Sequence, residues 1–393
     1  MYILGINISH HASVCLLKDG EVVFYLEEDR LSREKEAEYL TESSVEAFKK
    51  IPEYTKYLDY ICFVSFGRGG LDDDCIISYC LHKLDCMGIM HRRLVVEREH
   101  HLYHAYNAFY SSNFKEAAAL VLDGGGELFN NHYREAESMY VFGLEKSKCL
   151  FKHYGEQCFI PSKITLKKFI REKKVAEHPE EKNIFISSSL SCGNLFKEIS
   201  CALGLFSGEI GPRPGKTMGL SAYGNTDKLT KPWYKKDEKT GVWVTDNKRI
   251  IWDLYTKYRP FYHMLRRGWE AEDWVSKYYF DLEGEDEKSK EMFRAAADVA
   301  KKLQEETKLH TIRLIQDLLD RTCTNNVVLS GGYFLNCVNN YEYIKEFPEV
   351  NFYIDPIAHD GGTAMGAARY AWQHQDMIEK DTSRHPLKTL FLG

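Results

Sequence analysis

Three short apolar segments of this chain each run into a turn that is rich in glycine. The pairs of segment and turn are residues 117–122 with 123–127, residues 327–329 with 330–332, and residues 351–354 with 360–362. Apolar residues at helical spacing precede the second pair, over residues 292–319, and small residues open a helix after the third pair, at residues 363–368. Alternation of strand, glycine turn and helix is typical of parallel βαβ units, so this pattern predicts an α/β fold.

The same local pattern occurs twice in the chain. Residues 2–6 are apolar and strand-like, and two further apolar runs flank Asp19-Gly20, which is a typical hairpin turn. Residues 117–122 repeat the apolar strand, with residues 138–144 as the expected hairpin partner. Two copies of one unit predict duplicated lobes. The expected lobes are residues 1–115 and 116–393, the second with charged insertions at about residues 145–200 and 225–290.

Composition excludes several classes of protein. The net charge of −6 gives no global basic field for nucleic acid or anionic lipid, and leaves only a local basic groove open. No segment approaches the roughly 18 consecutive apolar residues of a membrane-spanning helix, and the first residues lack the apolar core of a signal peptide. The eleven cysteines are dispersed and form no C-x-x-C pair, as is typical of reduced thiols. We therefore expect a cytoplasmic protein that does not bind membranes.

Histidines are most concentrated at residues 100–104. On a helix, His100 and His104 lie one turn apart on the same face, a spacing that can chelate one metal ion. Asp123 and Asp360 each stand beside glycines after a predicted strand, although acids in such places also serve as plain turn formers. Two histidines and two carboxylates suit Fe(II), Mn(II) or Zn(II) better than Ca(II) or Cu(I).

The glycine turns are candidates for anion binding. Glycine lets the backbone approach a phosphate closely, and N–H groups can then form an anion cradle. Neither the dinucleotide fingerprint nor the P-loop fingerprint is present. Three turns in parallel positions therefore indicate a nucleotide or acyl-phosphate cleft of another kind. Lys216, between Gly215 and Gly219, is a candidate to neutralise an anionic leaving group, with a plain loop as the alternative.

Seven blocks occur in order along nearly the whole chain. They are LGINISHHAS (4–13), EEDRLSREK (27–35), HHLYHAYNAFYSS (100–112), LVLDGGGE (120–127), GKTMGLSAYG (215–224), VVLSGGYFLNCVNN (327–340) and AHDGGTAMGAA (358–368). In these blocks the chain closely resembles the O-carbamoyltransferase family, which includes nodulation proteins of the NodU type and the cephamycin and tobramycin carbamoyltransferases. The resemblance implies the two-lobed actin/hexokinase-like (ASKHA) α/β fold, shared with the threonylcarbamoyl-transfer protein of tRNA modification.

The resemblance also implies roles for individual residues. The family's metal ligands, which usually hold iron, fall on His100, His104, Asp123 and Asp360. The family's nucleotide-cleft residues fall on Gly124, Gly125, Gly331, Gly332 and Asn336. The family's N-terminal catalytic histidine falls on His10, and His101 is a second candidate for general base. The family usually has Asp where this chain has His11, so we expect the charge around His10 to differ.

The implied reaction is carbamoyl transfer to an acceptor hydroxyl, from carbamoyl phosphate or from carbamoyladenylate made with ATP. Family members usually carry a further YrdC-like domain that makes carbamoyladenylate, whereas this sequence ends at Gly393. We therefore expect either a separate YrdC-like activating protein or direct use of carbamoyl phosphate. An ASKHA kinase and a non-catalytic partner subunit are the alternatives.

The acceptor stays open at this point. Family acceptors include sugar hydroxyls of antibiotics and of signalling oligosaccharides. The chain is rich in Lys, Tyr, Asn and Ile and holds only 10 prolines, which is typical of a viral or AT-rich bacterial source. A hydroxymethylated pyrimidine such as 5-hydroxymethylcytosine, as a nucleotide or in DNA, is therefore an expected acceptor, although the acidic net charge disfavours DNA itself.

Overall fold

The computed structural model describes residues 1–33, 37, 47–64, 73–97, 99–129, 133–156, 176–177, 183–187, 189–207, 211–246, 250, 287–374 and 386–389. Parts of the two expected insertions, at residues 157–175, 178–182 and 251–286, lie outside these ranges. The chain divides into two compact units. Unit 1 comprises Met1–Lys152, Asp317–Leu335 and Phe347–Gly393, and unit 2 comprises His153–Gln316 and Asn336–Glu346. The expected lobe boundary between residues 115 and 116 stays a prediction.

The first sheet of unit 1 has five strands in the order β3-β2-β1-β4-β5. Its strands are β1 (Tyr2–Asn7), β2 (Ser13–Lys18), β3 (Glu21–Glu27), β4 (Tyr57–Val64) and β5 (Met90–Glu97). Strands β1, β2 and β3 are antiparallel neighbours, whereas β1, β4 and β5 are parallel. Asp19 and Gly20 between β2 and β3 have φ of 50° and 83°, which suits a two-residue hairpin turn. The predicted strand and hairpin are confirmed.

The second set of strands repeats this plan. In unit 1 the order is β8-β6-β16-β17, and β9 neighbours β8 on the other side. The strands are β6 (Glu116–Leu122), β7 (Leu128–Phe129, paired with β8), β8 (Tyr133–Gly143), β9 (Ser147–Glu156), β16 (Asn326–Ser330) and β17 (Asn351–Ile354). Strand β8 is antiparallel to β6, and β6, β16 and β17 are parallel. The carboxyl ends of the three parallel strands therefore meet at one edge, where ligands bind in open α/β sheets.

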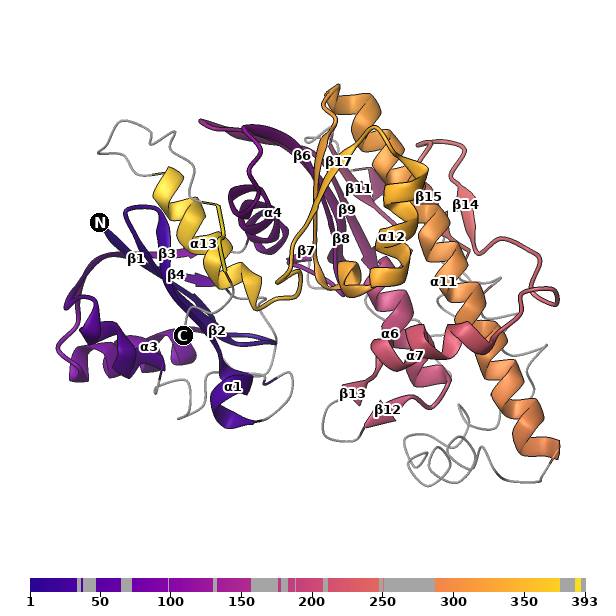
Figure 1. Cartoon of the computed structure of the whole chain (residues 1–393), viewed down its shortest axis with the longest axis horizontal. Coiled ribbons are helices and arrows are strands. Elements are labelled where there is room, and N and C mark those ends of the chain that lie inside the picture. The colour runs from indigo at the N-terminus through magenta and orange to yellow at the C-terminus, as the bar shows by residue number, and fades with distance from the viewer. Residues whose placement is uncertain are drawn as a thin grey trace. The chain divides into compact units, whose positions relative to one another are not determined.

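Two helices of unit 1 pack on one another, and each of them also packs on one of the two sheets. Helix α13 (Gly362–Gln373) contacts β1, β2 and β4, and it also packs on α4 (His100–Ser111), which lies against β6 and β16 (Figure 1). The two helices approach so closely that a Cβ at Gly366 would collide with the carbonyl oxygen of Tyr103. Glycine is thus required at this crossing.

Both faces of the first sheet are buried. Leu4 and Ile6 belong to a core that includes Ile77 and Leu84 of α3 (Asp73–Cys86), whereas Ile3 belongs to the core beneath α13. This alternation follows from the period of two along a strand. Unit 1 also holds α1 (Glu28–Ser32), η1 (Ile51–Glu53) and η4 (Gly332–Leu335). Helix α1 directly follows β3.

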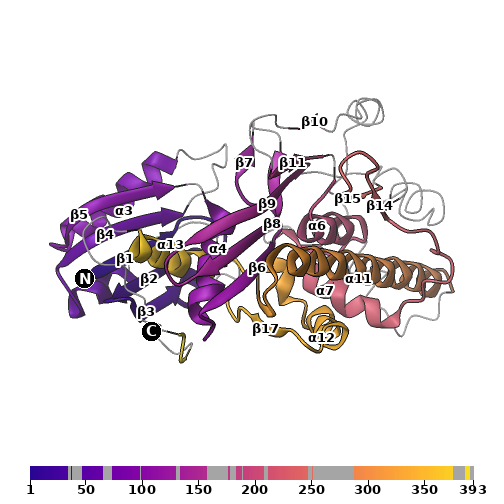
Figure 2. The same ribbon diagram turned by 90° about the horizontal axis from the view of Figure 1, so that it is seen from above.

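Unit 2 contains most of α11 (Glu287–Thr322), a single long helix that ends in unit 1 and confirms the helix predicted over residues 292–319 (Figure 2). Its other helices are α6 (Cys192–Ala202), α7 (Pro214–Leu220), η2 (Ser221–Tyr223) and α12 (Cys337–Glu346). Its short strands are β10 (Ala176–Glu177), β11 (Ile184–Ile186), β12 (Phe206–Ser207), β13 (Gly211–Pro212), β14 (Tyr234–Lys236) and β15 (Trp243–Thr245). None of the helices in the described ranges is long and apolar enough to cross a membrane.

Candidate metal centre

Helix α4 places two histidines side by side. The helix is buried on almost every side, as expected of a helix that lies within a core rather than on its surface. His100 and His104 are both 0% exposed, and their Nε2 atoms are 3.1 Å apart, as their spacing of one turn predicts. Because two nitrogen lone pairs repel at this distance, a proton or a cation must lie between them.

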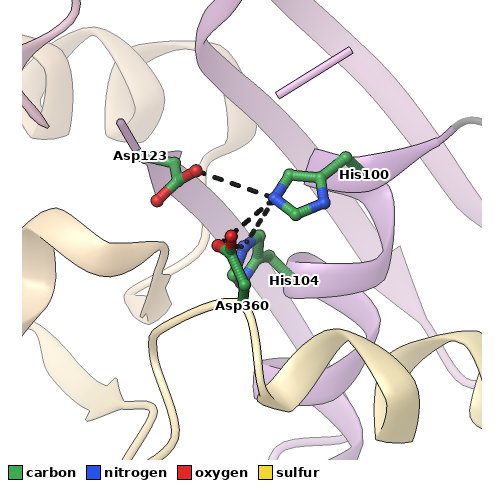
Figure 3. A group of neighbouring side chains, drawn as sticks. All are labelled: His100, His104, Asp123 and Asp360. Atoms are coloured by element: carbon green, nitrogen blue, oxygen red, sulfur yellow. Dashed lines mark hydrogen bonds and ion pairs between the residues drawn. The ribbon is translucent and has the colours of Figure 1, made fainter. Parts of the chain in front are cut away.

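Two carboxylates complete the group. Asp123 directly follows β6, and Asp360 lies in the loop between β17 and α13, so both come from the edge where the parallel strands end. His100 Nε2 lies 3.6 Å from Asp123 Oδ2 and 3.5 Å from Asp360 Oδ1, and His104 Nε2 lies 3.5 Å from that same Asp360 oxygen. Figure 3 shows the four side chains pointing toward one another. The sequence predicted these four residues as one set, and the fold brings them together.

The spacing of these atoms fits one ion. Donor atoms bonded at about 2.0–2.2 Å to a tetrahedral or octahedral ion are separated by roughly 2.8–3.6 Å. The four separations, from 3.1 to 3.6 Å, lie in this range. Two imidazoles and two carboxylates are also a donor set that borderline divalent metals accept. The residues present therefore fit a divalent cation.

The charges of the group also favour a bound cation. Burial opposes protonation of His100, but the nearby Asp123 and Asp360 outweigh it and raise the pKa of His100 to about 9. Burial likewise opposes ionisation of the two carboxyls, yet the histidines lower the pKa of both Asp123 and Asp360. Both carboxylates are therefore charged at neutral pH, and the buried group attracts positive charge.

The glycine turns hold Asp123 in place. The N–H of Gly332 donates to Asp123 Oδ1 at 2.9 Å, and the N–H of Gly125 donates to Asp123 Oδ2 at 3.3 Å. Gly331 has φ of 100°, its N–H donates to the carbonyl of Ala358, and a Cβ there would collide with the backbone of residue 122. These three N–H groups thus serve the protein itself. The expected binding of a nucleotide by these turns, including Gly124, stays a prediction.

His10 lies on a turn that is tied to the loop of Asp360. The amide of Asn7 is fully buried, and its Nδ2 donates to the carbonyl oxygens of His10 at 2.9 Å, His11 at 3.1 Å and Asp360 at 3.1 Å. Burial, together with the neighbouring His359 and His10, lowers the pKa of His11 to about 3. His10 therefore has a neutral imidazole beside it, where the family usually has an acid. Its role as general base stays a prediction.

A second close group contains His11, Glu27 and His359. Tyr25 Oη donates to Glu27 Oε1 at 2.7 Å, and His359 Nε2 lies 3.6 Å from the same oxygen. The N–H of Gly361 donates to His359 Nδ1 at 3.1 Å. A neutral imidazole that accepts at Nδ1 carries its proton on Nε2, so His359 faces Glu27 with an N–H rather than a lone pair. This group is a histidine–carboxylate pair rather than a second ligand set.

His101 lies outside the group of four ligands. It is 0% exposed, and its Nδ1 lies 2.9 Å from Ser138 Oγ, which donates to Glu135 Oε1 at 2.9 Å. Lys152 Nζ lies 3.2 Å from that same oxygen of Glu135. Burial lowers the pKa of His101 to about 4, so its imidazole is neutral at pH 7. Its expected role as an alternative general base stays a prediction.

Two further predicted residues belong to unit 2. Lys216 is exposed on helix α7, so the plain loop that we considered there is wrong. Asn336 is buried, with its Oδ1 accepting from Gln304 Nε2 at 2.9 Å and its Nδ2 donating to Gln304 Oε1 at 3.0 Å. Both polar ends of Asn336 are thus used inside unit 2. A role of either residue in binding a nucleotide stays a prediction.

The sequence interpretation missed the polar residues that support the candidate ligands. They are Asn7, Asn107, Ser330, Asp355 and Arg369, all of them buried. A signal was present for two of them, because Ser330 ends β16 and Asp355 directly follows β17 at the edge where we expected ligands. Asn107 and Arg369 lie inside apolar helices and carry no such signal.

Curated relatives of the chain are longer proteins. An uncharacterised protein of Synechocystis is 26% identical over 421 residues, a match that covers 96% of this chain and 59% of the relative. The nodulation protein NolNO of Sinorhizobium fredii is 22% identical over 399 residues, with 91% and 46% covered. The chain thus spans about half the length of the curated relatives it matches.

Solved structures show the same fold. Full-length HypF in a phosphate- and nucleotide-bound form aligns with a TM-score of 0.55 at 15% identity, covering 94% of this chain and 55% of HypF. HypF of T. kodakarensis aligns with a TM-score of 0.51 at 13% identity, with 94% and 47% covered. The predicted actin/hexokinase-like (ASKHA) α/β fold class is confirmed. The family model described as carbamoyltransferase N-terminus matches residues 73–369, most of the chain, and the chain belongs to this family, as its seven sequence blocks predicted.

Proposed function

We propose that this chain carries out carbamoyl transfer to an acceptor hydroxyl with a divalent metal ion. The observation that carries the proposal is the buried group of His100, His104, Asp123 and Asp360 at the strand ends of a carbamoyltransferase-family chain. The donor is carbamoyl phosphate or carbamoyladenylate. The acceptor oxygen forms a bond to the carbamoyl carbon, the bond from that carbon to the phosphate oxygen breaks, and phosphate or AMP leaves.

The four ligands would hold the ion through two imidazole nitrogens and two carboxylate oxygens. When bound, a divalent cation supplies Lewis acidity, which offsets the weak electrophilicity of a carbonyl that is conjugated to nitrogen. We propose iron as the first candidate, with manganese and zinc as alternatives that the same donor set accepts.

His10 is the proposed general base. It takes the proton of the acceptor hydroxyl as the new carbon–oxygen bond forms. Asn7 supports this role, because its amide donates both to the turn that carries His10 and to the loop that carries Asp360. The base and one ligand are thereby joined through a single buried side chain, which limits their relative movement.

The donor should be tested in both forms. HypF, which has the same fold, was solved with phosphate and a nucleotide, and this supports the inclusion of ATP among the trial substrates. We propose that the glycine turns of unit 1, at Gly124, Gly125, Gly331 and Gly332, contribute to a nucleotide site. The roles expected of Asn336 and Lys216, which belong to unit 2, stay predictions from the sequence. Carbamoyl phosphate alone is the simpler donor to try first.

The experiment is a mass-spectrometric assay of the metal-loaded chain. The chain is incubated with carbamoyl phosphate, with and without ATP, and with a panel of alcohols that holds sugars, antibiotic-like aminoglycosides and 5-hydroxymethylcytosine nucleotides. We expect a carbamoylated product, and a phosphorylated product would favour the kinase alternative. If the wild-type chain leaves every acceptor unmodified under all donor conditions, the proposal fails for this chain, and transfer by His10→Ala at the wild-type rate would exclude His10 as the base.

The acceptor class remains part of the proposal. A hydroxymethylated pyrimidine is our first candidate because of the composition of the chain, and sugar hydroxyls are the second. DNA as an acceptor, a separate activating protein and a cytoplasmic location stay predictions from the sequence.

A further inference from the structure

A line of buried polar side chains lies behind His104. Ser330 Oγ is 3.5 Å from His104 Nδ1 and 3.1 Å from Asp355 Oδ2. Asn107 Nδ2 donates to that same oxygen of Asp355 at 2.7 Å, and the N–H of Ile357 donates to Asp355 Oδ1 at 3.0 Å. His104, Ser330 and Asp355 are exposed by no more than 3%. Buried polar groups that are linked in this way are set by their hydrogen bonds rather than by water.

The direction of each hydrogen bond follows from the chemistry of the groups. Ser330 Oγ–H donates to Asp355 Oδ2, an oxygen that also accepts from Asn107 Nδ2. Ser330 has only one hydrogen, so its oxygen can meet His104 only as an acceptor. His104 therefore carries its proton on Nδ1 when neutral, and its Nε2 lone pair faces His100 and Asp360.

The far end of the line is anchored by a buried cation. Arg369 Nη1 donates to the carbonyl oxygen of Asn107 at 2.8 Å, to Asn107 Oδ1 at 3.1 Å and to Ser111 Oγ at 2.6 Å. With its Oδ1 accepting from Arg369, the amide of Asn107 is fixed with its NH₂ toward Asp355. The orientation in which the Asn107 amide donates to Asp355 is thus fixed by Arg369, so that α4 and α13 together hold this hydrogen bond in place.

We infer that Ser330 and Asp355 are positioning residues that hold His104 in the tautomer and orientation of a metal ligand. The inference rests on the metal centre of the proposed function and adds to it the residues that prepare one ligand. Partners of this kind behind a ligating imidazole typically change metal affinity by about 10–100-fold when they are removed.

The same helix offers a matched control. His101 has an equivalent line of Ser138 and Glu135, with the same order of imidazole, hydroxyl and carboxylate and with similar burial. His101 is not among the four ligands. Changes in this second line therefore disturb a buried histidine of α4 without touching the proposed metal centre.

The experiment titrates the metal-free chain with Co(II) and records both affinity and the visible absorption of the bound ion. The variants are Asp355→Asn and Ser330→Ala, with Glu135→Gln and Ser138→Ala as controls. Three donors, from Ser330, Asn107 and Ile357, face the two oxygens of Asp355, and Asp355→Asn leaves only one oxygen to accept from them, so this variant should loosen the hold on His104 Nδ1. We expect Asp355→Asn and Ser330→Ala to bind Co(II) about 10–100-fold more weakly than the wild type and to alter the spectrum of the bound ion. We expect the controls Glu135→Gln and Ser138→Ala to match the wild type in both measurements.

The outcomes separate the two claims. If Asp355→Asn and Ser330→Ala bind Co(II) like the wild type, or if all four variants weaken it equally, the positioning role is wrong while the metal centre stands. If the wild type binds Co(II) no better than His104→Ala, the metal centre itself is wrong, and the positioning role falls with it. Ser330→Ala removes one oxygen only, so it carries the test if Asp355→Asn fails to fold.

Discussion

The affinity of the centre for a metal ion should depend steeply on pH. In the metal-free chain, Asp123 and Asp360 raise the pKa of His100 to about 9, so His100 carries a proton at pH 7. A protonated imidazole carries a proton on each ring nitrogen, so one proton lies on Nε2, the nitrogen that faces the other proposed ligands. A metal ion must displace it in order to bind, because only the neutral imidazole ligates.

The magnitude follows from this competition. Well below a pKa of about 9, each step of one pH unit changes the fraction of neutral His100 by about tenfold, and at pH 9 about half of it is neutral, so apparent affinity should rise roughly 50-fold from pH 7 to pH 9. The two carboxyls do not titrate in this window, because their pKa values are lowered. Above pH 9 the affinity should level off.

The same proton affects the stability of the metal-free chain. The folded pKa of His100 lies above its ordinary value of 6.5, so protonated His100 stabilises the fold fully below that value. This contribution should be lost as the pH rises from about 6.5 through 9, whereas the metal-loaded chain should not lose it.

The assay is calorimetric titration of the metal-free chain with Co(II) at several pH values, in pairs of buffers with different ionisation enthalpies. The difference between buffers reports the protons released, and we expect about one proton per ion near pH 7.5. An affinity that is equal at pH 7 and pH 8, or binding without proton release, would refute the reasoning.

Three further predictions test other parts of the account. Replacing His104 by Ala should remove bound metal, measured by elemental analysis, and carbamoyl transfer together, and full activity of a metal-free preparation would contradict this. Gly331→Ala should lower the free energy of unfolding by about 2 kcal/mol or more, because φ is 100° and a Cβ would meet the backbone of Leu122. Gly215→Ala, where no atom of the described residues outside its own helix turn lies within 4 Å of the added Cβ, should change it by no more than about 1 kcal/mol in urea titration. The pKa of Glu135 is lowered from 4.5 to about 2, so its contribution to stability should be present above pH 4.5 and lost as the pH falls toward 2. Glu135→Gln should flatten that part of the pH–stability curve, and an unchanged curve would exclude Glu135 as its cause.

The four proposed ligands could be predicted because each had a local signal. His100 and His104 share a helix face through their spacing, and Asp123 follows an apolar strand and precedes glycines. Parallel strands bring their carboxyl ends to one edge, so strand-end acids from distant parts of the chain could be expected to meet. The resemblance to the family implied the same four residues.

The supporting residues were harder to predict because their partners are distant in the sequence. Asn107 bonds to Asp355, which lies 248 positions away, and only the packing of α4 beside β16 brings them together. The inward hydrogen bonds of the glycine turns were also beyond sequence reasoning. A glycine-rich turn looks the same whether its N–H groups face a ligand or, as at Gly125 and Gly332, a carboxylate of the protein.

The central claim is that His100, His104, Asp123 and Asp360 form one metal centre. Anomalous X-ray diffraction from crystals of the wild-type chain grown with Co(II) tests it most directly, because it locates the ion without relying on activity. We predict one strong peak within bonding distance of His100 Nε2, His104 Nε2 and both carboxylates. A strong peak elsewhere, or no peak at these residues in crystals saturated with Co(II), would contradict the account.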